Sequence, residues 1–457
     1  MEIEKLFSEI SNFLWNYPLI FLLIGGGLFL IFYSGFKPFK YFFHAIDILR
    51  GKYDNPTDSG EISHFSALST ALSATVGMGN IAGVAIAIDI GGPGAIFWMW
   101  ISGIIGMSTK FFTSSLAIMY RGKDSLGNIQ GGPMYFIEEG LGKNWKPLAI
   151  MFSACGIFGA LPLFNANQLK EALNHIVLDP NNLSNGFTSD IIIGLILILI
   201  TGFVILGGLK RISNVASRLV PFMVVVYLGC VLYILTINSD SLLGCFQMIF
   251  SDAFTASYFD PNEQIAGGVL GSLIIYSFRR GVFSNEAGIG MAPMAHGAAK
   301  TNSPIREGLV AMLGPAIDTL FVCTLTALAI LVTGVWDDQN TITTTLEGVT
   351  LTANAFSDSM PVLGNYLLLA CVIIFSLSSM FTYSYYGTKC LSYLIGEKNK
   401  KYYNYIYIFS IMIAAIASVE IMINIIDIFF ALMIIPTMLA TIILAPKVVE
   451  ALKKYKI

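Results

Sequence analysis

Charged residues are scarce in this sequence. Asp, Glu, Lys and Arg together make up 12% of the 457 residues, whereas hydrophobic residues make up 55%. Because soluble domains carry roughly one quarter charged residues, this composition excludes an ordinary soluble protein and predicts an integral membrane protein. The net charge of −3 adds little, since the sidedness of charge matters more than its sum in a membrane protein.

Cysteine and histidine are also few, and their spacing excludes several classes of site. The six cysteines form no C-x-x-C pair, which argues against a disulfide framework and a zinc site. None of the four histidines lies four residues from another in a zincin-type pattern with a carboxylate. No Ser/His, paired-Asp or His/Glu set stands at catalytic spacing. We therefore predict that the protein is not an enzyme, needs no cofactor and has no nucleic-acid partner.

A basic leader is likewise missing. The chain begins Met1-Glu2-Ile3-Glu4, which is acidic where a secretory signal would be basic. We expect the first apolar run to be retained as a membrane span.

Long apolar runs are what the sequence has in abundance. At roughly 20 apolar residues per span, it predicts eleven transmembrane helices, near 15–35, 65–89, 94–120, 147–177, 190–208, 213–237, 266–298, 307–334, 360–388, 403–425 and 427–445. Every second connection is rich in Lys and Arg, whereas the connections at 179–189, 238–265 and 335–359 contain none. Because short cytoplasmic loops collect basic residues, we expect a multi-pass protein of the cell membrane with its N-terminus outside and its C-terminus in the cytoplasm.

Two of these spans contain residues that break a helix. The first is Thr75-Val-Gly-Met-Gly-Asn80, and the second is Tyr276-Ser-Phe-Arg-Arg-Gly-Val-Phe-Ser-Asn285, about 200 residues further on. In hydrocarbon an interrupted backbone is tolerated only where it lines a cavity or binds something. The two broken spans therefore predict a binding site near the membrane midplane.

The positions of the breaks predict the architecture. Without the first span, ten helices remain, and a broken helix opens each set of five. An odd number of spans makes the two sets face opposite ways across the bilayer, as in the inverted repeats of secondary transporters. We predict an all-α integral membrane protein with an inverted 5+5 repeat preceded by one extra helix. The expected divisions are an extra helix and cytoplasmic loop at 1–64, a first repeat at 65–265 and a second at 266–457.

The first break offers groups for both charges of an amino acid. The freed N–H groups of Gly77, Met78 and Gly79 can accept a carboxylate at the start of the second half-helix. The carbonyls that end the first half, around 73–76, can hold Na⁺ or the ammonium, and Thr75 and Asn80 add side-chain oxygens. The alternative is that the glycines only allow close helix packing. Two glycines two residues apart do not share a helical face, so we favour the binding site.

Polar side chains in other spans extend this site. Asn165 and Gln168 lie three residues apart on one helical face and are donors for a carboxylate; the alternative is an amide bond between helices. Ser378 and Ser379 are adjacent hydroxyls that suit an alkali cation, although such hydroxyls often bond back to their own helix. Phe158 is a candidate for closing the pocket.

Charged residues within spans are functional candidates by default. Arg279 and Arg280 follow the expected second break towards the cytoplasm, where we expect gating or anchoring of the half-helix. Asp318 either relays a proton, holds a cation or forms a buried pair with a neighbouring helix.

Several segments resemble one known family, the alanine or glycine:cation symporters, also called sodium:alanine symporters. The strongest match is GGPGAIFWMWISGIIG at 91–106, supported by QGGPMYFIEEGLG at 130–142, GGLKRISNVASRLVPFM at 207–223, RRGVFSNEAGIG at 279–290 and YYGTKC at 385–390. The resemblance implies a leucine-transporter-type fold of the amino acid–polyamine–organocation superfamily. It also implies Na⁺-driven uptake of a small neutral amino acid.

Carried over from the family, one sodium ion would meet backbone oxygens of Ser73, Val76 and Phe375 and the hydroxyls of Ser378 and Ser379. Tyr276 and Ser277, in the expected second break, would join the substrate site. The family usually has two threonines where Ser378 and Ser379 stand, which keeps the oxygen ligands. It usually has a glycine where Ser277 stands, so the serine would narrow the pocket.

The leading hypothesis is a secondary transporter that binds sodium and alanine, possibly glycine, and alternates between outward and inward states. A proton-coupled carrier on the same fold is the near alternative, and an amino-acid sensor or channel is a more distant one. The lipid bilayer is an expected partner. The choice among alanine, glycine and serine, the enantiomer, the number of sodium ions and the oligomeric state stay open.

Overall fold

The computed structural model describes residues 2–15, 17–55, 57–184, 186–260, 264, 267–337 and 348–456. Within them the chain is helical apart from one hairpin, whose strands β1 (Gly122–Lys123) and β2 (Ile129–Gln130) are antiparallel and pair Gly122 with Gln130. The expected boundary between 265 and 266 lies outside the described residues, and the division into two repeats stays a prediction.

The N-terminal part contains the segments that precede the first broken helix. They are α1 (Glu2–Leu14), α2 (Tyr17–Ile20), the π-helical turn η1 (Phe21–Gly25), α3 (Gly26–Tyr33), α4 (Lys37–Lys40) and α5 (Phe42–Leu49). The sequence predicts one span at 15–35, but α1 is an additional helix, bent by 45° from the helix that follows it.

The next part runs from the first broken helix to a short helix at one end of the bundle. Its helices are α6 (His64–Thr75), α7 (Met78–Gly91), α8 (Gly94–Met119), α9 (Pro133–Leu141), η2 (Lys143–Trp145), α10 (Lys146–Gly159), α11 (Leu163–Leu173), η3 (Asn174–Leu178), α12 (Phe187–Ile205), α13 (Gly208–Ile237), η4 (Ser239–Ser241) and α14 (Leu242–Thr255).

The last part begins with the second broken helix. Its helices are α15 (Gly268–Asn285), α16 (Ala292–His296), α17 (Pro304–Ala311), α18 (Leu313–Pro315), η6 (Ala316–Cys323), α19 (Thr324–Thr333), η7 (Val335–Asp337), α20 (Val349–Ser359), α21 (Leu363–Ile395), η8 (Glu397–Asn399), α22 (Lys401–Ile416) and α23 (Val419–Lys454).

Eight helices of the described chain are long and apolar enough to cross a membrane, or nine if the bent N-terminal pair counts as one span. The two remaining predicted spans differ from these helices. One is α15 together with α16, and α15 carries two arginines. The other is α22, which is short at 16 residues. The chain is thus a multi-helix membrane protein, and the count of eleven spans stays a prediction.

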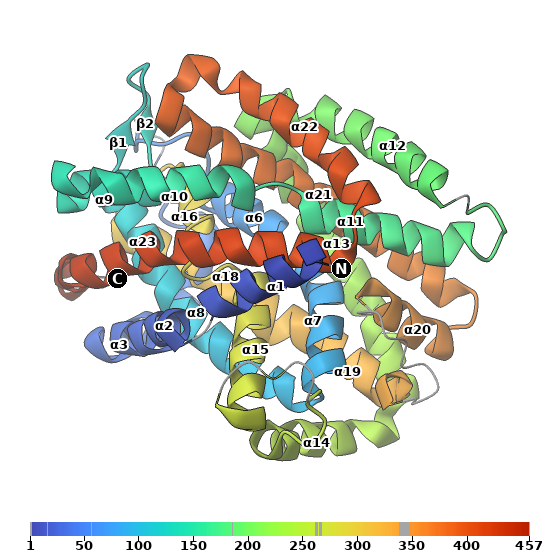
Figure 1. Cartoon of the computed structure of the whole chain (residues 1–457). Helices are drawn as coiled ribbons and strands as arrows, with labels where there is room; N and C mark the ends of the chain where they lie inside the picture. The colour runs from blue at the N-terminus through green and yellow to red at the C-terminus, as the bar shows by residue number, and fades with distance from the viewer. Residues whose placement is uncertain are drawn as a thin grey trace.

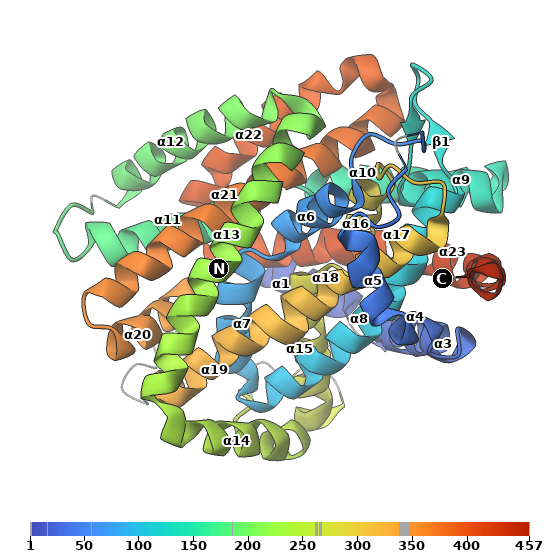
Figure 2. The same cartoon turned by 180° about the vertical axis from the view of Figure 1, so that it is seen from behind.

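The broken helices lie inside the bundle and the more apolar helices lie outside. Figures 1 and 2 show α7, α8 and α15 side by side, α12 and α22 at one edge, and α14 across the opposite end. In α12, much of the surface is exposed and apolar, as lipid-facing helices require, whereas α7 and most of α8 are buried. The groups available at the breaks are therefore enclosed by protein.

The first break lies where the sequence predicts it. Helix α6 ends at Thr75 and α7 begins at Met78, with Val76 and Gly77 outside both helices. The second break is displaced from the prediction: α15 runs without interruption through 276–285, and the chain leaves the helix only at 286–291. Glu286, Gly288 and Gly290 have φ values of 55°, 86° and 100° there, a left-handed backbone that ends a helix and suits glycine.

Candidate functional site

The end of α6 meets the middle of α21, and several oxygens converge there. Ser73 Oγ donates to the carbonyl oxygen of Ser378 at 2.8 Å, and Thr382 Oγ1 donates to Ser73 Oγ at 3.1 Å. The hydroxyls of Ser378 and Ser379 both donate to the carbonyl oxygen of Phe375 at 3.0 Å. All five residues are buried. The hydroxyls do bond back to their own helix, but on the side that faces the break.

The backbone at the break leaves carbonyls of α6 without their helical donors. The N–H of Gly77 donates to Asn80 Oδ1 at 2.8 Å, whereas in a continuous helix it would donate to the carbonyl of Ser73. The carbonyls from 73 to 76 therefore receive no hydrogen bond from within the helix. A Cβ at residue 77 would collide with the hydroxyl of Ser379 and lie 3.6 Å from the Phe375 carbonyl oxygen. The freed end of α6, with Val76 directly after it, thus lies beside the hydroxyls of α21.

The start of α7 presents N–H groups, although fewer than the sequence predicts. Because Gly77 is engaged by Asn80, the first-turn donors that remain at the break are those of Met78 and Gly79. Asn80 does not offer its oxygen to a substrate: its Oδ1 caps α7 and its Nδ2 donates to Asp318 Oδ1 at 2.6 Å. Thr75 Oγ1 donates back to the carbonyl of Ala71 at 3.3 Å. Both side chains thus bond within the protein here, and their contact with substrate stays a prediction.

The two amides of α11 are in different situations. Gln168 Oε1 accepts the N–H of Val349 at 3.2 Å, so it caps the start of α20 rather than facing the break. Asn165 is 5% exposed and has no hydrogen-bond partner among the described residues. Its neighbour Phe164 packs against Phe283 of α15, with ring centroids 5.0 Å apart. Asn165 therefore stands as a free donor in the helical turn that approaches the break.

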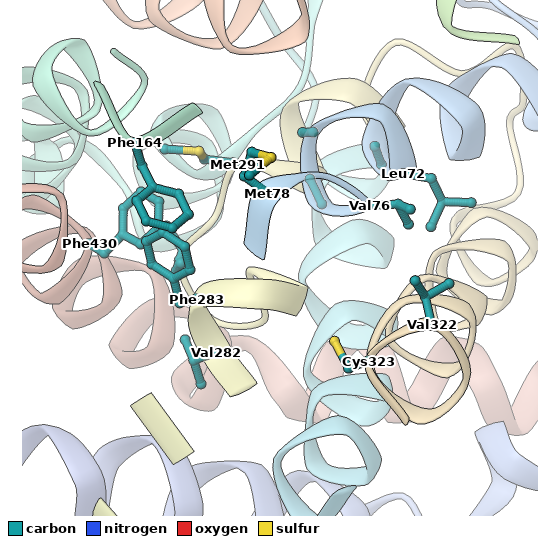
Figure 3. Close-up of a cluster of buried hydrophobic side chains, with 14 of the residues drawn as sticks. Leu72, Val76, Met78, Phe164, Val282, Phe283, Met291, Val322, Cys323 and Phe430 are labelled. Atoms are coloured by element: carbon teal, nitrogen blue, oxygen red, sulfur yellow. The ribbon is translucent and has the colours of Figure 1, made fainter. Parts of the chain in front are cut away.

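An apolar wall lies beside the start of α7. Figure 3 shows Met78 next to Met291 of the second break, with Phe164, Phe283 and Phe430 grouped nearby. The rings of Phe283 and Phe430 have centroids 5.9 Å apart, and a Cβ on Gly79 would lie 3.6 Å from the Phe283 ring. These side chains limit the size of whatever occupies the space at the break.

Three predicted substrate residues lie away from the break. Ser277 stands nine residues before Glu286, about 13 Å along α15 at 1.5 Å per residue. Its hydroxyl donates to the carbonyl of Leu273 at 2.6 Å and faces Gly91, at the far end of α7. Tyr276 is in the same turn, with its ring 5.5 Å from the Arg280 guanidinium. Because α15 is continuous there, neither residue lines the break.

Phe158 is the third of these residues. It is 47% exposed and stacks on Phe429, with ring centroids 4.9 Å apart. Aromatic side chains on the outside of a membrane bundle meet lipid. The aromatic residues of α11, α15 and α23 described above, and not Phe158, lie beside the first break.

A buried carboxylate lies between the two breaks. Asp318, in the π-helical turn η6, accepts from Ser284 Oγ at 2.7 Å and Thr319 Oγ1 at 2.9 Å in addition to Asn80. Such turns are rare and frequently lie at functional sites. These bonds join it to α7 and α15, in agreement with the predicted alternative of a buried pair with a neighbouring helix, while a role in proton relay or cation binding stays a prediction. Sequence reasoning overlooked Ser284, whose signal is its place just before the second break.

A second charged cluster joins α15 to α23. Arg279 and Arg280 both pair with Asp427 Oδ2, the first at 2.5 Å, and all three side chains are buried. Arg279 also bonds Ser11 and Asn12 of α1. The arginines precede the second break, so the expectation that they follow it towards the cytoplasm is wrong. They tie the opposite half of the broken helix to α23, and Asp427 was not among the predicted residues.

Comparison with known proteins gives close relatives over the full length. A model of the sodium:alanine symporter family matches residues 1–457. The sodium/alanine symporter AgcS of Methanococcus maripaludis is 38% identical over 457 residues, covering 100% of this chain and 98% of that protein. The probable sodium/glutamine symporter GlnT of Bacillus subtilis is 35% identical, with 99% and 91% covered. The putative sodium/proton-dependent alanine carrier YrbD of Bacillus subtilis is 34% identical, with 86% and 80% covered.

A solved structure shows the same fold. The crystal structure of MhsT in complex with L-phenylalanine aligns with a TM-score of 0.60 and covers 86% of this chain and 98% of that one. Only 13% of the aligned residues are identical, so the likeness concerns the fold alone. It supports the transporter fold that the sequence predicts.

Proposed function

Because this chain belongs to the sodium:alanine symporter family, we propose that it couples sodium entry to the uptake of a small neutral amino acid, alanine or glycine, by alternating access. It is a transport protein and not an enzyme. The proposal includes the cell membrane as its location, with the N-terminus outside and the C-terminus in the cytoplasm.

One observation carries the proposal: groups for a cation and groups for an anion adjoin at the same break. The carbonyls from 73 to 76 lack helical donors, and their segment contacts α21 at Phe375, Ser378 and Ser379; carbonyl and hydroxyl oxygens suit a hard cation. The N–H groups of Met78 and Gly79 open a helix whose dipole favours a negative charge. A sodium ion and the carboxylate of a zwitterion would therefore stabilise each other in the low dielectric of the bundle.

The remaining parts of an amino acid also find partners. Asn165 has an amide free to donate to the carboxylate, and Asp318 lies close enough to Asn80 to attract the ammonium. The wall formed by Met78, Phe164 and Phe283 favours a side chain no larger than a methyl group or a hydrogen. Since 100 mV supplies about 2.3 kcal/mol per charge, one sodium ion with its chemical gradient suffices to concentrate the substrate.

The decisive experiment is radiolabelled alanine uptake by the full chain in proteoliposomes. We expect uptake under an inward sodium gradient, and its loss when choline replaces sodium. Unlabelled glycine and serine, both enantiomers of alanine, glutamine and phenylalanine are tested as competitors, and glutamine is included because a relative is named for it. Undiminished uptake in choline would remove sodium from the mechanism, and currents above carrier turnover would indicate a channel.

Proton coupling is the second candidate, favoured by Asp318. This buried carboxylate contacts both broken helices through Asn80 and Ser284, and one relative is named a sodium/proton-dependent carrier. A proton gradient imposed without sodium separates the two candidates in the same assay. Uptake driven by that gradient alone would favour the proton-coupled carrier.

We expect Asn165→Ala to raise the half-saturation concentration for alanine about tenfold, because a hydrogen bond to a charged group contributes roughly 1.5–3 kcal/mol. Maximal uptake should change less, because Asn165 forms no side-chain hydrogen bond with another described residue and so contributes little to holding the fold. Alanine-dependent uptake at saturating sodium is the measurement. Asn214→Ala, on the exposed surface of α13, is the control. An unchanged half-saturation value in Asn165→Ala would remove this residue from the site.

A further inference from the structure

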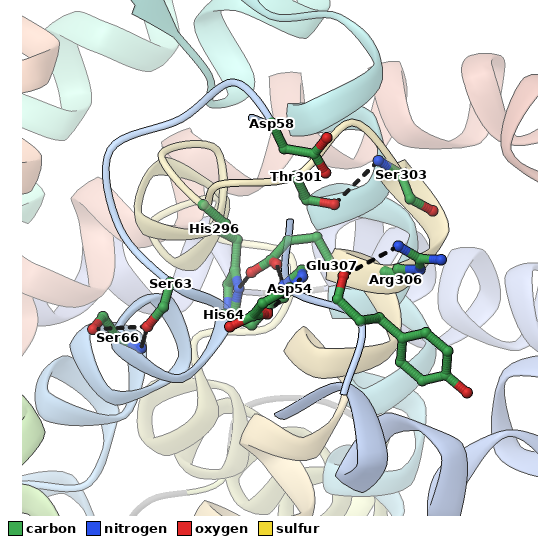
Figure 4. A network of polar contacts seen from close by, with 12 residues as sticks. Asp54, Asp58, Ser63, His64, Ser66, His296, Thr301, Ser303, Arg306 and Glu307 are labelled. Carbon is green, nitrogen blue, oxygen red and sulfur yellow. Dashed lines mark hydrogen bonds and ion pairs between the residues drawn. The ribbon is translucent and has the colours of Figure 1, made fainter. Parts of the chain in front are cut away.

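Three titratable side chains meet at the other ends of the broken helices, outside the proposed site. His64 begins α6, His296 ends α16 and Glu307 lies in α17. Each histidine directs Nδ1 to one oxygen of Glu307: His64 contacts Oε2, and His296 lies 2.5 Å from Oε1. Figure 4 shows the carboxylate between the two rings. None of the three side chains is more than 2% exposed.

Backbone contacts enclose this cluster. Residues 59–62, before α6, run beside 298–301, after α16: the N–H of Glu61 donates to the carbonyl of Ala298 at 2.8 Å, and the N–H of Lys300 donates to that of Ile62 at 2.6 Å. Arg121 donates to the carbonyl of Thr301 at 3.0 Å. The two half-helices are thus held together at the end of the bundle where basic connections gather. In the proposed orientation this end is cytoplasmic.

From this geometry we propose that His64, Glu307 and His296 form a proton-binding latch that holds the cytoplasmic path shut. The inference rests on the proposed alternating-access function, since release to the cytoplasm requires the inner half-helices α6 and α16 to separate from each other or from α17. The side chains of the latch connect these three helices, α6, α16 and α17, to one another.

Protonation tightens the latch. With neutral rings, Glu307 accepts one hydrogen bond from each Nδ1–H, and a proton on either imidazole turns that bond into a buried ion pair, which is stronger. His64 Nε2 lies 4.0 Å from Asp54 Oδ1, and His296 Nε2 has no hydrogen-bond partner among the described residues. Histidine changes charge between about pH 5 and 8, so the latch strengthens as cytoplasmic pH falls.

The charged groups around the latch do not substitute for the contacts that His64 and His296 make with Glu307. Arg306 is held over the ring of Tyr53 at 5.0 Å and bonds its carbonyl oxygen. Arg121 is engaged with backbone carbonyls, and Asp58 accepts from Asn302. Asp54 is the one of these groups that faces an imidazole directly. A proton on His64 would therefore lie between two carboxylates.

The test measures opening directly, without transport. Thr70 of α6 is fully buried behind the latch, so maleimide labelling of a Thr70→Cys variant of the full chain reports separation of α6. We expect labelling to be several-fold faster at pH 8 than at pH 6. Labelling of Thr57→Cys, in the exposed loop, corrects for thiol ionisation, and the parent chain gives the background of the native cysteines.

Adding Glu307→Gln to Thr70→Cys should accelerate labelling and abolish its corrected pH dependence. If that protein does not fold, judged by size-exclusion chromatography, His296→Gln serves instead and should reduce the pH dependence; His175→Gln, outside the latch, should not. Labelling with the same pH dependence in every variant would overturn the proposal. If labelling follows the prediction while sodium-driven alanine uptake is absent, the latch stands and the proposed function fails.

Discussion

We expect Gly77→Val to abolish sodium-driven uptake. A Cβ at this position would collide with the hydroxyl of Ser379 and stand 3.6 Å from the carbonyl oxygen of Phe375, and valine adds two further carbons. The side chain would fill the space between the carbonyls of α6 and the hydroxyls of α21, where the cation is proposed to bind. Overpacking of this kind typically lowers stability by roughly 1–3 kcal/mol. Alanine uptake as a function of sodium concentration is the measurement.

Two companion variants separate a blocked site from a damaged fold. Gly229→Val, on α13, adds a side chain at a position where no described residue lies within 4 Å and should transport normally. Ser379→Ala removes one oxygen without adding bulk and should weaken apparent sodium affinity about tenfold, or about 1.4 kcal/mol. Sodium-driven uptake by Gly77→Val with a normal half-saturation for sodium would contradict the placement of the ion.

The first break is predictable because its cause is local. Gly77 and Gly79 lie in an apolar run, and Asn80 supplies the side chain that takes the N–H of Gly77 away from the helix. Which oxygens the break meets is not local. Ser378 and Ser379 lie about 300 residues away, and their place in the site rested on the family resemblance.

The second break lies later in the chain than predicted because polar residues alone do not interrupt a helix. Within this segment Arg279 and Arg280 pair with Asp427 of α23, and Arg279 also bonds α1, while the backbone of α15 stays helical. The helix ends at Glu286, where Gly288 and Gly290 have positive φ values. The glycines were therefore a better signal than the arginines.

Residues whose roles depend on contacts with distant parts of the chain are hard to identify from the sequence. Asp427 lies in the apolar run of α23, and only its distance to Arg279 and Arg280 shows that it neutralises them. Phe158 and Phe164 have the same residue type in one predicted span, yet only Phe164 faces inward. Periodicity does not distinguish the lipid-facing side of a span from its protein-facing side when both are apolar.

Asp427→Ala is expected to be the most destabilising single change proposed. It would leave Arg279 and Arg280 buried without a counter-charge, and removing one partner of a buried ion pair costs about 3–5 kcal/mol. It would also disturb α1, because Arg279 bonds Ser11 and Asn12. We expect a lower thermal midpoint for the purified protein in detergent. The midpoint is measured by size-exclusion chromatography after heating.

The control for this change lies on the same helix. Asn424→Ala alters a residue one turn earlier on α23, which lines a cavity of about 60 Å³ together with Arg279 and Arg280. It removes no charge, so its thermal midpoint should stay close to that of the unaltered protein. A midpoint for Asp427→Ala equal to that of Asn424→Ala would show that the two arginines do not depend on the carboxylate.

A milder replacement connects the ion pair to transport. Asp427→Asn keeps the size of the side chain and removes its charge, so α15 and α23 lose their attraction while packing is preserved. The Arg280 guanidinium lies 5.2 Å from the ring of Phe283, and that ring faces Gly79 at the start of α7. Separation of α15 from α23 would therefore move the apolar wall away from the substrate site, on the outer side in the proposed orientation.

We accordingly expect Asp427→Asn to favour the outward-open state. Bound alanine would exchange faster with the outside, while concentrative uptake would fall because the outer path no longer closes. Exchange and net uptake are measured in the same proteoliposomes. Adding Arg279→Gln removes one of the two unpaired cations and should recover part of the thermal stability but not the uptake. Equal losses of exchange and uptake in Asp427→Asn would instead mean that the ion pair supports the fold alone.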